Sequence, residues 1–408
     1  MERSNSAPLN NKSYRLMRNR IFSTIVAVAS CAVVSAQGTC IINGHIADSQ
    51  LADGKKIKKV YLTRTNEFGQ VMEVAATKVK KGNYTFKYAL AQDEPVLQYT
   101  ITGFGNGQDI ALFVEPGKVE VNTPMAEEAA QSSVTGTPTN DDYAAYKAIA
   151  DDGQREVARQ IADLEALHGS SWFETAEGKD AIKQIKAREA IRVQSQSMRF
   201  LIDHNASPLM PLEVERTLLP KLSKAYAEQM SKAVAYPLQQ HPYYLSLRNT
   251  VLANNLKVGT EAPDITLPLL SGEVAHLNDY RGKHVILNFW TDAEQAAEMI
   301  AALQNVYELT REQQEGFVIL SISLDAEKAA WKEAVANLGL DREGWLHACD
   351  GAGANSPAAK RYGVDKTPRI ILIEPEGHAV SLNMEIDEVA MRIEQILWGD
   401  LYYLDQVK

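Results

Sequence analysis

The sequence predicts a multidomain protein of mixed α+β and α/β class, because three stretches with different patterns of polar and apolar residues follow one another along its 408 residues. Residues 37–138 contain short segments in which apolar and polar residues alternate, separated by Gly and Asn. This pattern is typical of an antiparallel β-sandwich-like or barrel-like domain. Residues 139–255 show helical periodicity, and residues 256–408 alternate buried strands with helices. A basic and apolar segment, residues 1–36, precedes these three domains. The chain is long enough for two or three separate cores.

Residues 1–36 have the pattern of a secretory signal peptide. Basic residues up to Arg20 precede Ile21–Val34, an uncharged run that leads to a small-residue cleavage site at Ala36. The run has 14 residues, whereas a helix needs about 20 to cross a bilayer. We therefore expect an exported protein with no transmembrane helix in the mature chain.

The segment Val28–Cys31 offers a second cleavage site, because its pattern resembles that of a bacterial lipoprotein signal. Cleavage there would leave Cys31 as a lipid anchor in the outer or inner membrane. The residues after Cys31 are apolar, whereas a lipoprotein tether is usually polar. Soluble export is therefore favoured, and lipidation stays open.

Charge and cysteine usage exclude several classes of partner and site. Removal of residues 1–36 takes away five basic residues and one acidic residue, which changes the formal charge from −10 to −14. An acidic surface repels phosphate backbones, so nucleic acid is not an expected partner. Of the three cysteines, Cys31 leaves with the signal peptide, and Cys40 and Cys349 have no metal-binding or disulfide spacing. The histidines are also scattered, so we expect neither a metal nor another cofactor.

The first two domains have no candidate catalytic cluster. In residues 37–138, segments such as KKVYLTR and GNYTFKYAL alternate in polarity, and no cluster of titratable side chains accompanies them. In residues 139–255, Val157, Ile161 and Leu164 repeat at helical spacing, and prolines mark breaks between helices. We expect the β-rich domain to pack or dock, and the helices to bridge the two ends of the chain.

Residues 256–408 have the pattern of an α/β domain. The runs HVILNFW, FVILSISLD and RIILIEP are almost continuously apolar, as are strands that are buried on both faces of a sheet. Helical stretches lie between these runs. The strands are therefore expected to form a parallel or mixed sheet with helical crossovers.

A set of motifs runs through this last domain. It comprises Gly259, Ala262-Pro263-Asp264, Gly272, Leu277, Tyr280-Arg281-Gly282-Lys283, Phe317–Asp325, Trp331 and Thr367–Gly377. As a set, the motifs resemble thioredoxin-like domains of the peroxiredoxin type (alkyl hydroperoxide reductase, thiol-specific antioxidant) and of bacterial envelope thiol-disulfide oxidoreductases. The resemblance implies a thioredoxin-like α/β/α fold and a place in the periplasm or cell envelope. Residues 40–255 resemble the uncharacterised β-domain and helical linker that often precede such domains in Gram-negative envelope proteins.

The turn after the HVILNFW strand departs from this family. Active members carry Cys-x-x-Cys there, where the positive end of a helix lowers the pKa of the first thiol. Depending on a two-residue gap, these positions fall on Asp292 and Gln295 or on Glu294 and Ala297. Neither pair supplies sulfur, so dithiol exchange at this turn is excluded.

The same turn has the pattern of a stabilised helix start. Thr291 with Glu294 predicts a capping box, and Asp292 with Gln295 is an overlapping alternative. Acidic side chains suit the positive end of a helix, and such a cap contributes about 1 kcal/mol. A further alternative is that Asp292 or Glu294 acts as an acid or base, although no histidine or second partner lies nearby in the sequence.

Thr367 and Pro368 occupy the position of the family's cis-proline, immediately before a strand. The resemblance implies that the backbone before this proline pairs with an extended substrate peptide as an added strand. It also places Trp290 at the border of the same groove. We therefore predict a binding module for an extended peptide or an envelope protein, with the binding residues Trp290, Thr291, Asp292, Glu294, Gln295, Thr367 and Pro368. In the alternative interpretation, Pro368 only shapes the loop and Trp290 only packs.

Cys349 keeps an enzymatic alternative open. The segment WLHACD predicts a short strand whose carboxyl end lies at the same sheet edge as the Thr291 turn. A thiol at this edge can form a mixed disulfide, as in a thiol-disulfide oxidoreductase or peroxidase that uses one cysteine. Cysteine is also among the most frequently buried residues, so we expect Cys349 and Cys40 to be buried and inert. A purely architectural role is the third alternative for the protein.

Overall fold

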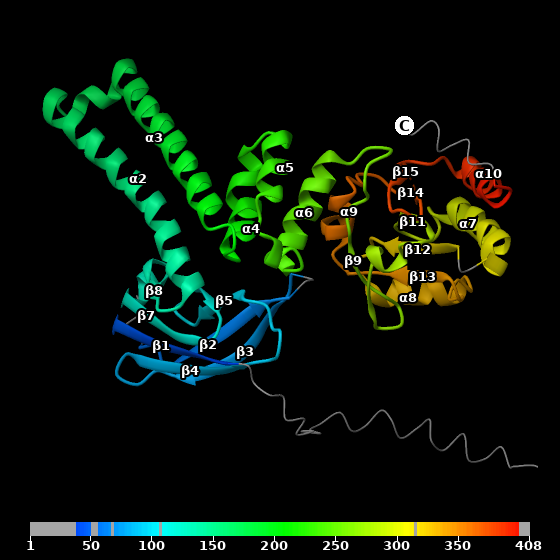
Figure 1. Cartoon of the computed structure of the whole chain (residues 1–408), viewed down its shortest axis with the longest axis horizontal. Coiled ribbons are helices and arrows are strands. Elements are labelled where there is room, and N and C mark those ends of the chain that lie inside the picture. Colours follow the sequence, from blue (N-terminus) through cyan, green and yellow to red (C-terminus); the bar gives the residue numbers. More distant parts are fainter. Residues whose placement is uncertain (1–37, 50–55, 67–68, 106–107, 314–315, 400–408) are drawn as a thin grey trace, which may run out of the picture.

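The computed structural model describes residues 38–49, 56–66, 69–105, 108–313 and 316–399. The predicted signal peptide and the Cys31 anchor lie outside the described residues. Within these ranges, no helix has the length and apolar character that crossing a bilayer requires. The described chain folds in order into two four-stranded sheets, a group of helices and a domain built on a five-stranded sheet (Figure 1).

Two sheets pack over one core in the amino-terminal part of the chain. Their strands are β1 Gly38–Asp48, β2 Lys59–Thr65, β3 Val71–Lys78, β4 Asn83–Leu90, β5 Leu97–Thr102, β6 Ile110–Val114, β7 Gly117–Met125 and β8 Ser133–Thr135. One sheet has the order β4-β1-β7-β8 and the other β3-β2-β5-β6. Because alternate residues of each strand point inward, Ile42 of the first sheet and Leu62 and Ile101 of the second share one hydrophobic cluster. The predicted sandwich is confirmed.

One strand pair differs from the predicted antiparallel arrangement. β1 and β7 run parallel, with Cys40 opposite Gly117. The chain between these two strands forms β4 and all four strands of the second sheet. Such a long crossover allows a parallel pairing, which a tight hairpin cannot make.

A long helical hairpin follows the two sheets. Its helices, α2 (Pro138–His168) and α3 (Ala176–Asp203), lie side by side and project away from the sheets (Figure 1). Thr175 caps α3, because its hydroxyl accepts a hydrogen bond from the Gly178 N–H. The other helical elements up to the last domain are η1 Ala126–Gln131, η2 Ser170–Glu174, α4 Leu209–Glu213, the π-helical η3 Val214–Leu218, η4 Leu219–Lys221, α5 Lys224–Lys232, η5 Tyr236–Leu238 and α6 Pro242–Asn255.

Asn140 joins the base of this hairpin to β6. Its side chain is fully buried and binds both main-chain groups of Phe113: Oδ1 accepts from the N–H and Nδ2 donates to the carbonyl oxygen, each at 2.8 Å. Nδ2 also donates to Thr137 Oγ1 at 2.8 Å. Since β6 is the edge strand of its sheet, Asn140 supplies the partner that a neighbouring strand would otherwise provide.

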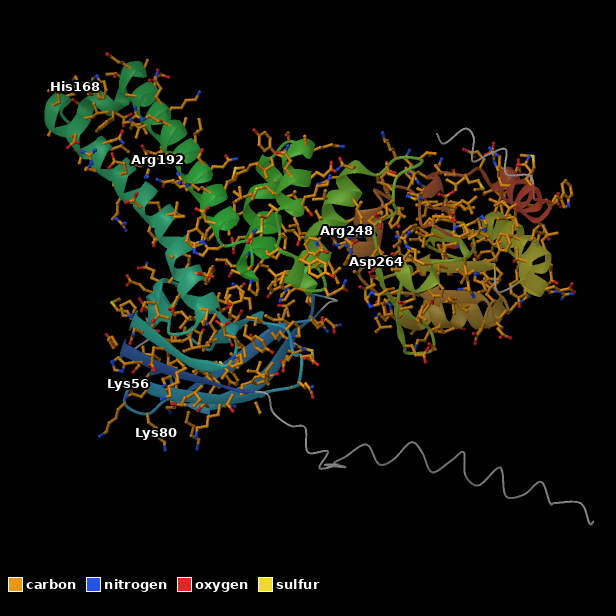
Figure 2. All side chains as sticks on the ribbon, viewed as in Figure 1. Lys56, Lys80, His168, Arg192, Arg248 and Asp264 are labelled. Carbon is orange, nitrogen blue, oxygen red and sulfur yellow. The ribbon has the colours of Figure 1, made fainter. Side chains whose placement is uncertain are left out.

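Ion pairs and a hydrogen bond connect α6 to the carboxy-terminal domain. Arg248 Nη2 lies 2.6 Å from Glu261 Oε2, and the other oxygen of Glu261 lies 3.0 Å from Arg281 Nη2. Asn249 Oδ1 accepts a hydrogen bond from the Asp264 N–H at 3.0 Å. Figure 2 shows Arg248 and Asp264 at this junction. The last domain is therefore attached to the helices by side-chain contacts as well as by the chain.

The carboxy-terminal domain is a mixed sheet with helices on both faces. Its strands β11 His284–Trp290, β12 Phe317–Ser323, β13 Trp345–Ala348, β14 Arg369–Ile373 and β15 Ala379–Ser381 have the order β13-β12-β11-β14-β15. β11, β12 and β13 are parallel, whereas β14 and β15 are each antiparallel to their neighbour. One face packs against α7 Ala297–Thr310, α8 Lys328–Asn337 and α10 Ile386–Leu397, and the other against α9 Pro357–Arg361 and segment 262–277. The predicted α/β/α arrangement is confirmed.

Smaller elements complete this domain. They are the hairpin of β9 Thr266–Pro268 and β10 Val274–His276, and the short helices η6 Leu277–Tyr280, η7 Arg311–Gln313 and η8 Gly353–Asn355. The central strands β11 and β12 are buried along almost their whole length, as their apolar sequences indicate. The sheet therefore forms a rigid support for the loops at its edges.

Replacing Asn140 by Ala is expected to lower the free energy of unfolding by about 3 kcal/mol, because two buried main-chain groups of Phe113 lose their partners. Urea unfolding followed by circular dichroism measures the change. The matched control is Asn122→Ala, which alters an exposed asparagine on β7 and should change stability by less than about 0.5 kcal/mol. Equal losses in the two variants would contradict the role assigned to Asn140.

Candidate functional site

The predicted site residues lie where three parallel strands end. Because β11, β12 and β13 are parallel, their carboxyl ends share one edge of the sheet. Thr291 follows β11 directly, Asp325 lies two residues beyond β12, and Cys349 follows β13. The prediction that Cys349 lies at the same edge as the Thr291 turn is confirmed.

Asp325 connects the three strand ends. Its Oδ1 accepts a hydrogen bond from the Asp292 N–H at 3.3 Å, and its Oδ2 accepts one from the Ser323 hydroxyl at 2.6 Å. Its main-chain carbonyl accepts a hydrogen bond from the Cys349 thiol at 3.3 Å. Asp325 is absent from the set of site residues that the sequence predicts. The acid at the end of the apolar run FVILSISLD is the signal that could have found it.

Asp292, and not Thr291, stabilises the turn before α7. Its Oδ1 accepts hydrogen bonds from the N–H groups of Glu294 at 2.9 Å and Gln295 at 3.4 Å. Its backbone has a φ of +53°, in the left-handed region that Asp tolerates better than most residues. The predicted Thr291–Glu294 capping box is therefore wrong. Of the alternative box, Asp292 with Gln295, the hydrogen bond from the Gln295 N–H to the Asp292 side chain is present. α7 itself begins only at Ala297.

The Thr291 hydroxyl is directed away from the helix, which explains why it caps nothing there. Its Oγ1 lies 2.8 Å from Thr367 Oγ1, and either atom can donate the hydrogen. The Thr367–Pro368 peptide bond is cis, as the resemblance implies. The hydroxyl pair joins the turn after β11 to the loop before β14.

Trp290 does not border an open groove. Its side chain is 2% exposed and packs in a hydrophobic cluster with Met299, Leu303 and Trp331. Alternation along β11 directs this last residue of the strand to the sheet face that α7 covers. The prediction that Trp290 lines the binding groove is therefore wrong, and the alternative that it only packs is correct.

The open part of the edge surrounds Pro368. A depression of about 350 Å³ is lined by Thr367, Pro368 and Arg369 and, from the loop after β15, by residues that include Asn383 and Glu385. The predicted binding residues Glu294 and Gln295 are exposed on the turn before α7, but they do not line this depression. The structure thus brings Thr291 and Thr367 together and leaves Glu294 and Gln295 apart from them.

The two described cysteines are both buried, in different domains. Cys349 is 2% exposed, and burial raises the pKa of its thiol above the ordinary value. Cys40 lies within β1 with no exposed surface, and burial raises the pKa of its thiol as well. Thiol exchange requires an accessible thiolate, and neither residue provides one. The predicted burial of both cysteines is confirmed.

The carboxylates of this edge are arranged for hydrogen bonding. In the part of the chain that the structure describes, no group of three or more His, Cys, Asp or Glu side chains could hold a metal ion. Asp292 uses Oδ1 to accept from two N–H groups, and Asp325 uses both oxygens. This occupancy favours a structural role for Asp292 over the acid or base alternative.

Comparison with family models agrees with this geometry. A model described as the AhpC/TSA family matches residues 258–381. The carboxy-terminal domain is an AhpC/TSA domain. A second model, the domain of unknown function DUF4369, matches residues 40–143, which include both sheets of the β-rich part and the start of α2.

The relatives of the AhpC/TSA domain are named for thiol-disulfide exchange. Thiol-disulfide oxidoreductase ResA of Geobacillus thermodenitrificans is 27% identical over 143 residues, which are 34% of this chain and 78% of the relative. ResA of Bacillus subtilis is 26% identical over 140 residues, 34% of this chain and 74% of the relative. The thioredoxin domain of a thiol-disulfide oxidoreductase from Bacteroides vulgatus has a solved structure that is 27% identical, covers 35% of this chain and 98% of its own, and has a TM-score of 0.31. A thiol-disulfide oxidoreductase from Bacteroides fragilis is 27% identical, covers 34% and 99%, and has a TM-score of 0.30.

Replacing Asp292 by Ala is expected to lower the free energy of unfolding of the AhpC/TSA domain by about 2 kcal/mol. The lost cap costs about 1 kcal/mol, and an alanine in the left-handed region costs about 1 kcal/mol more. Urea unfolding followed by tryptophan fluorescence measures the loss. The matched control is Asp292→Asn, which keeps an acceptor oxygen and tolerates this φ, so its loss should stay below about 0.5 kcal/mol. Equal stability of the two variants would show that the side chain is no cap.

Proposed function

We propose that this protein is an exported thioredoxin-fold protein of the cell envelope that binds an extended polypeptide and performs no dithiol exchange. The AhpC/TSA domain carries the binding surface beside Thr367 and Pro368. One observation carries the proposal: Thr367 lines an open depression, and among the described residues no hydrogen-bond partner occupies its main-chain N–H or carbonyl.

The absence of sulfur at the turn supports the non-enzymatic part of the proposal. Residues 291–298 contain no cysteine, and carboxylate or amide side chains cannot exchange disulfides. Asp292 instead holds main-chain N–H groups of the turn. The named relatives are thiol-disulfide oxidoreductases. We propose that this chain shares their domain and lacks their chemistry.

Main-chain hydrogen bonding supports a polypeptide as the occupant. An extended peptide can pair with unoccupied N–H and C=O groups as an added strand. The Thr367 side chain is already engaged with Thr291, which holds the loop in place for such pairing. The depression is lined by both signs of charge, for example Lys366 and Glu385, which suits a peptide with mixed side chains better than a single small ion.

Export is part of the proposal and rests on the pattern of residues 1–36. A lipid anchor at Cys31 is the open alternative. Mass spectrometry of the mature amino terminus separates the two, because cleavage after Ala36 removes Cys31 and lipidation retains it with added acyl mass.

Residues 37–408 are expected to catalyse no reduction of insulin disulfides by dithiothreitol above background. Glu294→Cys with Ala297→Cys introduces two thiols in one family register, at the turn that leads into α7. Asp292→Cys with Gln295→Cys does so in the other register. We expect at least one of these double variants to gain activity, because a dithiol at a helix start can exchange disulfides. Turbidity of precipitating insulin is the measurement. Wild-type activity that disappears in Cys349→Ser would contradict the proposal and support a single-cysteine enzyme.

Reduced, carboxymethylated α-lactalbumin, a permanently unfolded polypeptide, is expected to bind residues 37–408. Asn383→Trp places a large ring in the depression and should weaken this binding at least fivefold. The matched control is Asn337→Trp, at an exposed asparagine at the end of α8, which should leave the affinity unchanged. Fluorescence anisotropy of labelled lactalbumin measures both. Equal affinities for the two variants would exclude the Thr367 depression as the binding surface.

A further inference from the structure

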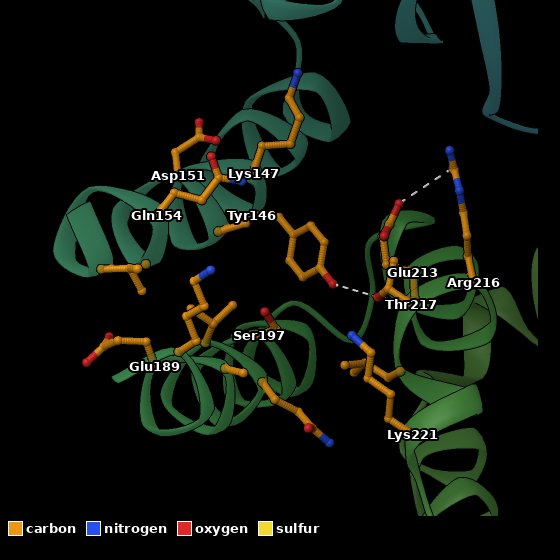
Figure 3. A pocket seen from close by; sticks show the side chains of 18 of the residues that line it. Tyr146, Lys147, Asp151, Gln154, Glu189, Ser197, Glu213, Arg216, Thr217 and Lys221 are labelled. Atoms are coloured by element: carbon orange, nitrogen blue, oxygen red, sulfur yellow. Dashed lines mark hydrogen bonds and ion pairs between the residues drawn. The ribbon is translucent and has the colours of Figure 1, made fainter. Parts of the chain in front are cut away.

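A second cavity lies in the helical region, outside the AhpC/TSA domain. It has a volume of about 720 Å³ and is lined by residues of α2, α3 and the α4–η3–η4 segment (Figure 3). Pockets for small organic ligands usually measure about 300–1,000 Å³. The cavity therefore has the size of a ligand site.

Aromatic and hydroxyl groups form the inner wall. Figure 3 shows the Tyr146 ring directed toward Thr217, and the two hydroxyl oxygens lie 2.9 Å apart. The Thr217 hydroxyl donates onward to the Glu213 carbonyl oxygen at 2.7 Å, so Tyr146 is the donor to Thr217. Gly153 lets the two hairpin helices approach closely, because a Cβ there would lie 2.3 Å from Val193 Cγ2. The wall is thus close-packed and held by hydrogen bonds.

The buried acidic side chains of the cavity already have cationic partners. Glu189 Oε2 lies 2.6 Å from Arg192 Nε, and Glu213 Oε1 lies 3.7 Å from Arg216 Nη1. Both glutamates are almost fully buried. Asp151 is the remaining acid in the lining, and it is exposed. The acids therefore leave little negative charge to attract a cationic ligand.

Two lysines of the cavity have no such partner. Lys186 and Lys221 line it with exposed side chains, as Asp151 does, and neither forms an ion pair or hydrogen bond with any residue that the structure describes. Figure 3 shows the Lys221 side chain extending toward Thr217. A third lysine, Lys147, lies 4.8 Å from the centre of the Tyr143 ring. In a chain of net charge −10, this lining has an uncompensated positive charge.

The backbone of one wall is irregular. Residues 214–218 form a π-helical turn between α4 and η4, and Arg216, Thr217 and Leu218 of this turn line the cavity. Such turns are rare in proteins overall, and a large share of those that occur are found at functional sites.

We propose that this cavity binds a small organic anion with an apolar body, such as a carboxylic acid with an alkyl or aromatic tail. Its carboxylate lies between the ammonium groups of Lys186 and Lys221. Its tail packs against Tyr143, Tyr146 and Val193. A neutral or cationic ligand of the same shape leaves the lysines without a partner and binds less tightly. The proposal is independent of the polypeptide surface, because the cavity is built from a different domain.

Isothermal titration calorimetry of residues 37–408 with decanoate, decan-1-ol and decylamine tests the preference for negative charge. Decanoate is expected to bind at least tenfold more tightly than the other two. Lys186→Gln with Lys221→Gln should weaken decanoate binding at least tenfold. The matched control, Lys183→Gln with Lys224→Gln, changes exposed lysines of α3 and α5 that do not line the cavity, and it should leave the affinity unchanged.

A second variant and a second probe complete the test. Ala190→Trp fills the cavity from α3 and keeps every lysine, so it should abolish decanoate binding with an unchanged circular-dichroism spectrum. 2-Naphthoate supplies an aromatic tail in place of the alkyl chain. Absence of binding of both carboxylates to the wild-type chain would overturn the proposal, and so would equal affinity for decanoate and decan-1-ol. Decanoate binding that persists in both the lysine variant and Ala190→Trp would also overturn it, because the acid then binds elsewhere.

Discussion

The hydrogen bonds of Asp325 fix the geometry of the candidate site. Its carboxylate binds the Asp292 N–H and the Ser323 hydroxyl, and its carbonyl binds the Cys349 thiol. One residue thereby couples the ends of three parallel strands. The same residues make this edge acidic, and negative neighbours raise the pKa of a thiol. For Cys349, burial is the larger cause and the charge of Asp350 adds to it. The edge is built to hold main chain in place and disfavours a thiolate.

The sequence predicts the layers of the fold better than it predicts the contacts between distant segments. Continuous apolar runs identify β11, β12 and β14, because a strand that is buried on both faces has no solvent-facing row of polar side chains. The cap fails for a long-range reason: the Thr291 hydroxyl binds Thr367, 76 positions away, and a local rule cannot include that partner. The burial of Trp290 likewise depends on which face α7 covers, and the parallel β1–β7 pair depends on a crossover.

Two binding regions are proposed for one chain, and they differ in what a sequence can reveal of them. The absence of sulfur between Thr291 and Glu298 is visible directly in the sequence. The depression beside Pro368 also needs the loop that contains Asn383, and the helical cavity needs lysines from two separate elements. Such sites form only when distant segments meet. Their residues show no spacing pattern that distinguishes them from ordinary surface positions.

The parallel pairing of β1 with β7 has a consequence for how the amino-terminal domain is assembled. β1 is an inner strand of its sheet, between β4 and β7, yet among the strands that the structure describes it is the first that a ribosome or a secretion channel releases. One flank of β1 keeps unpaired amide and carbonyl groups until β7 has emerged. Long-range parallel pairing of this kind is slow to form. The sheet that contains β1 is therefore completed only after β7 has been released, late in the synthesis of the domain.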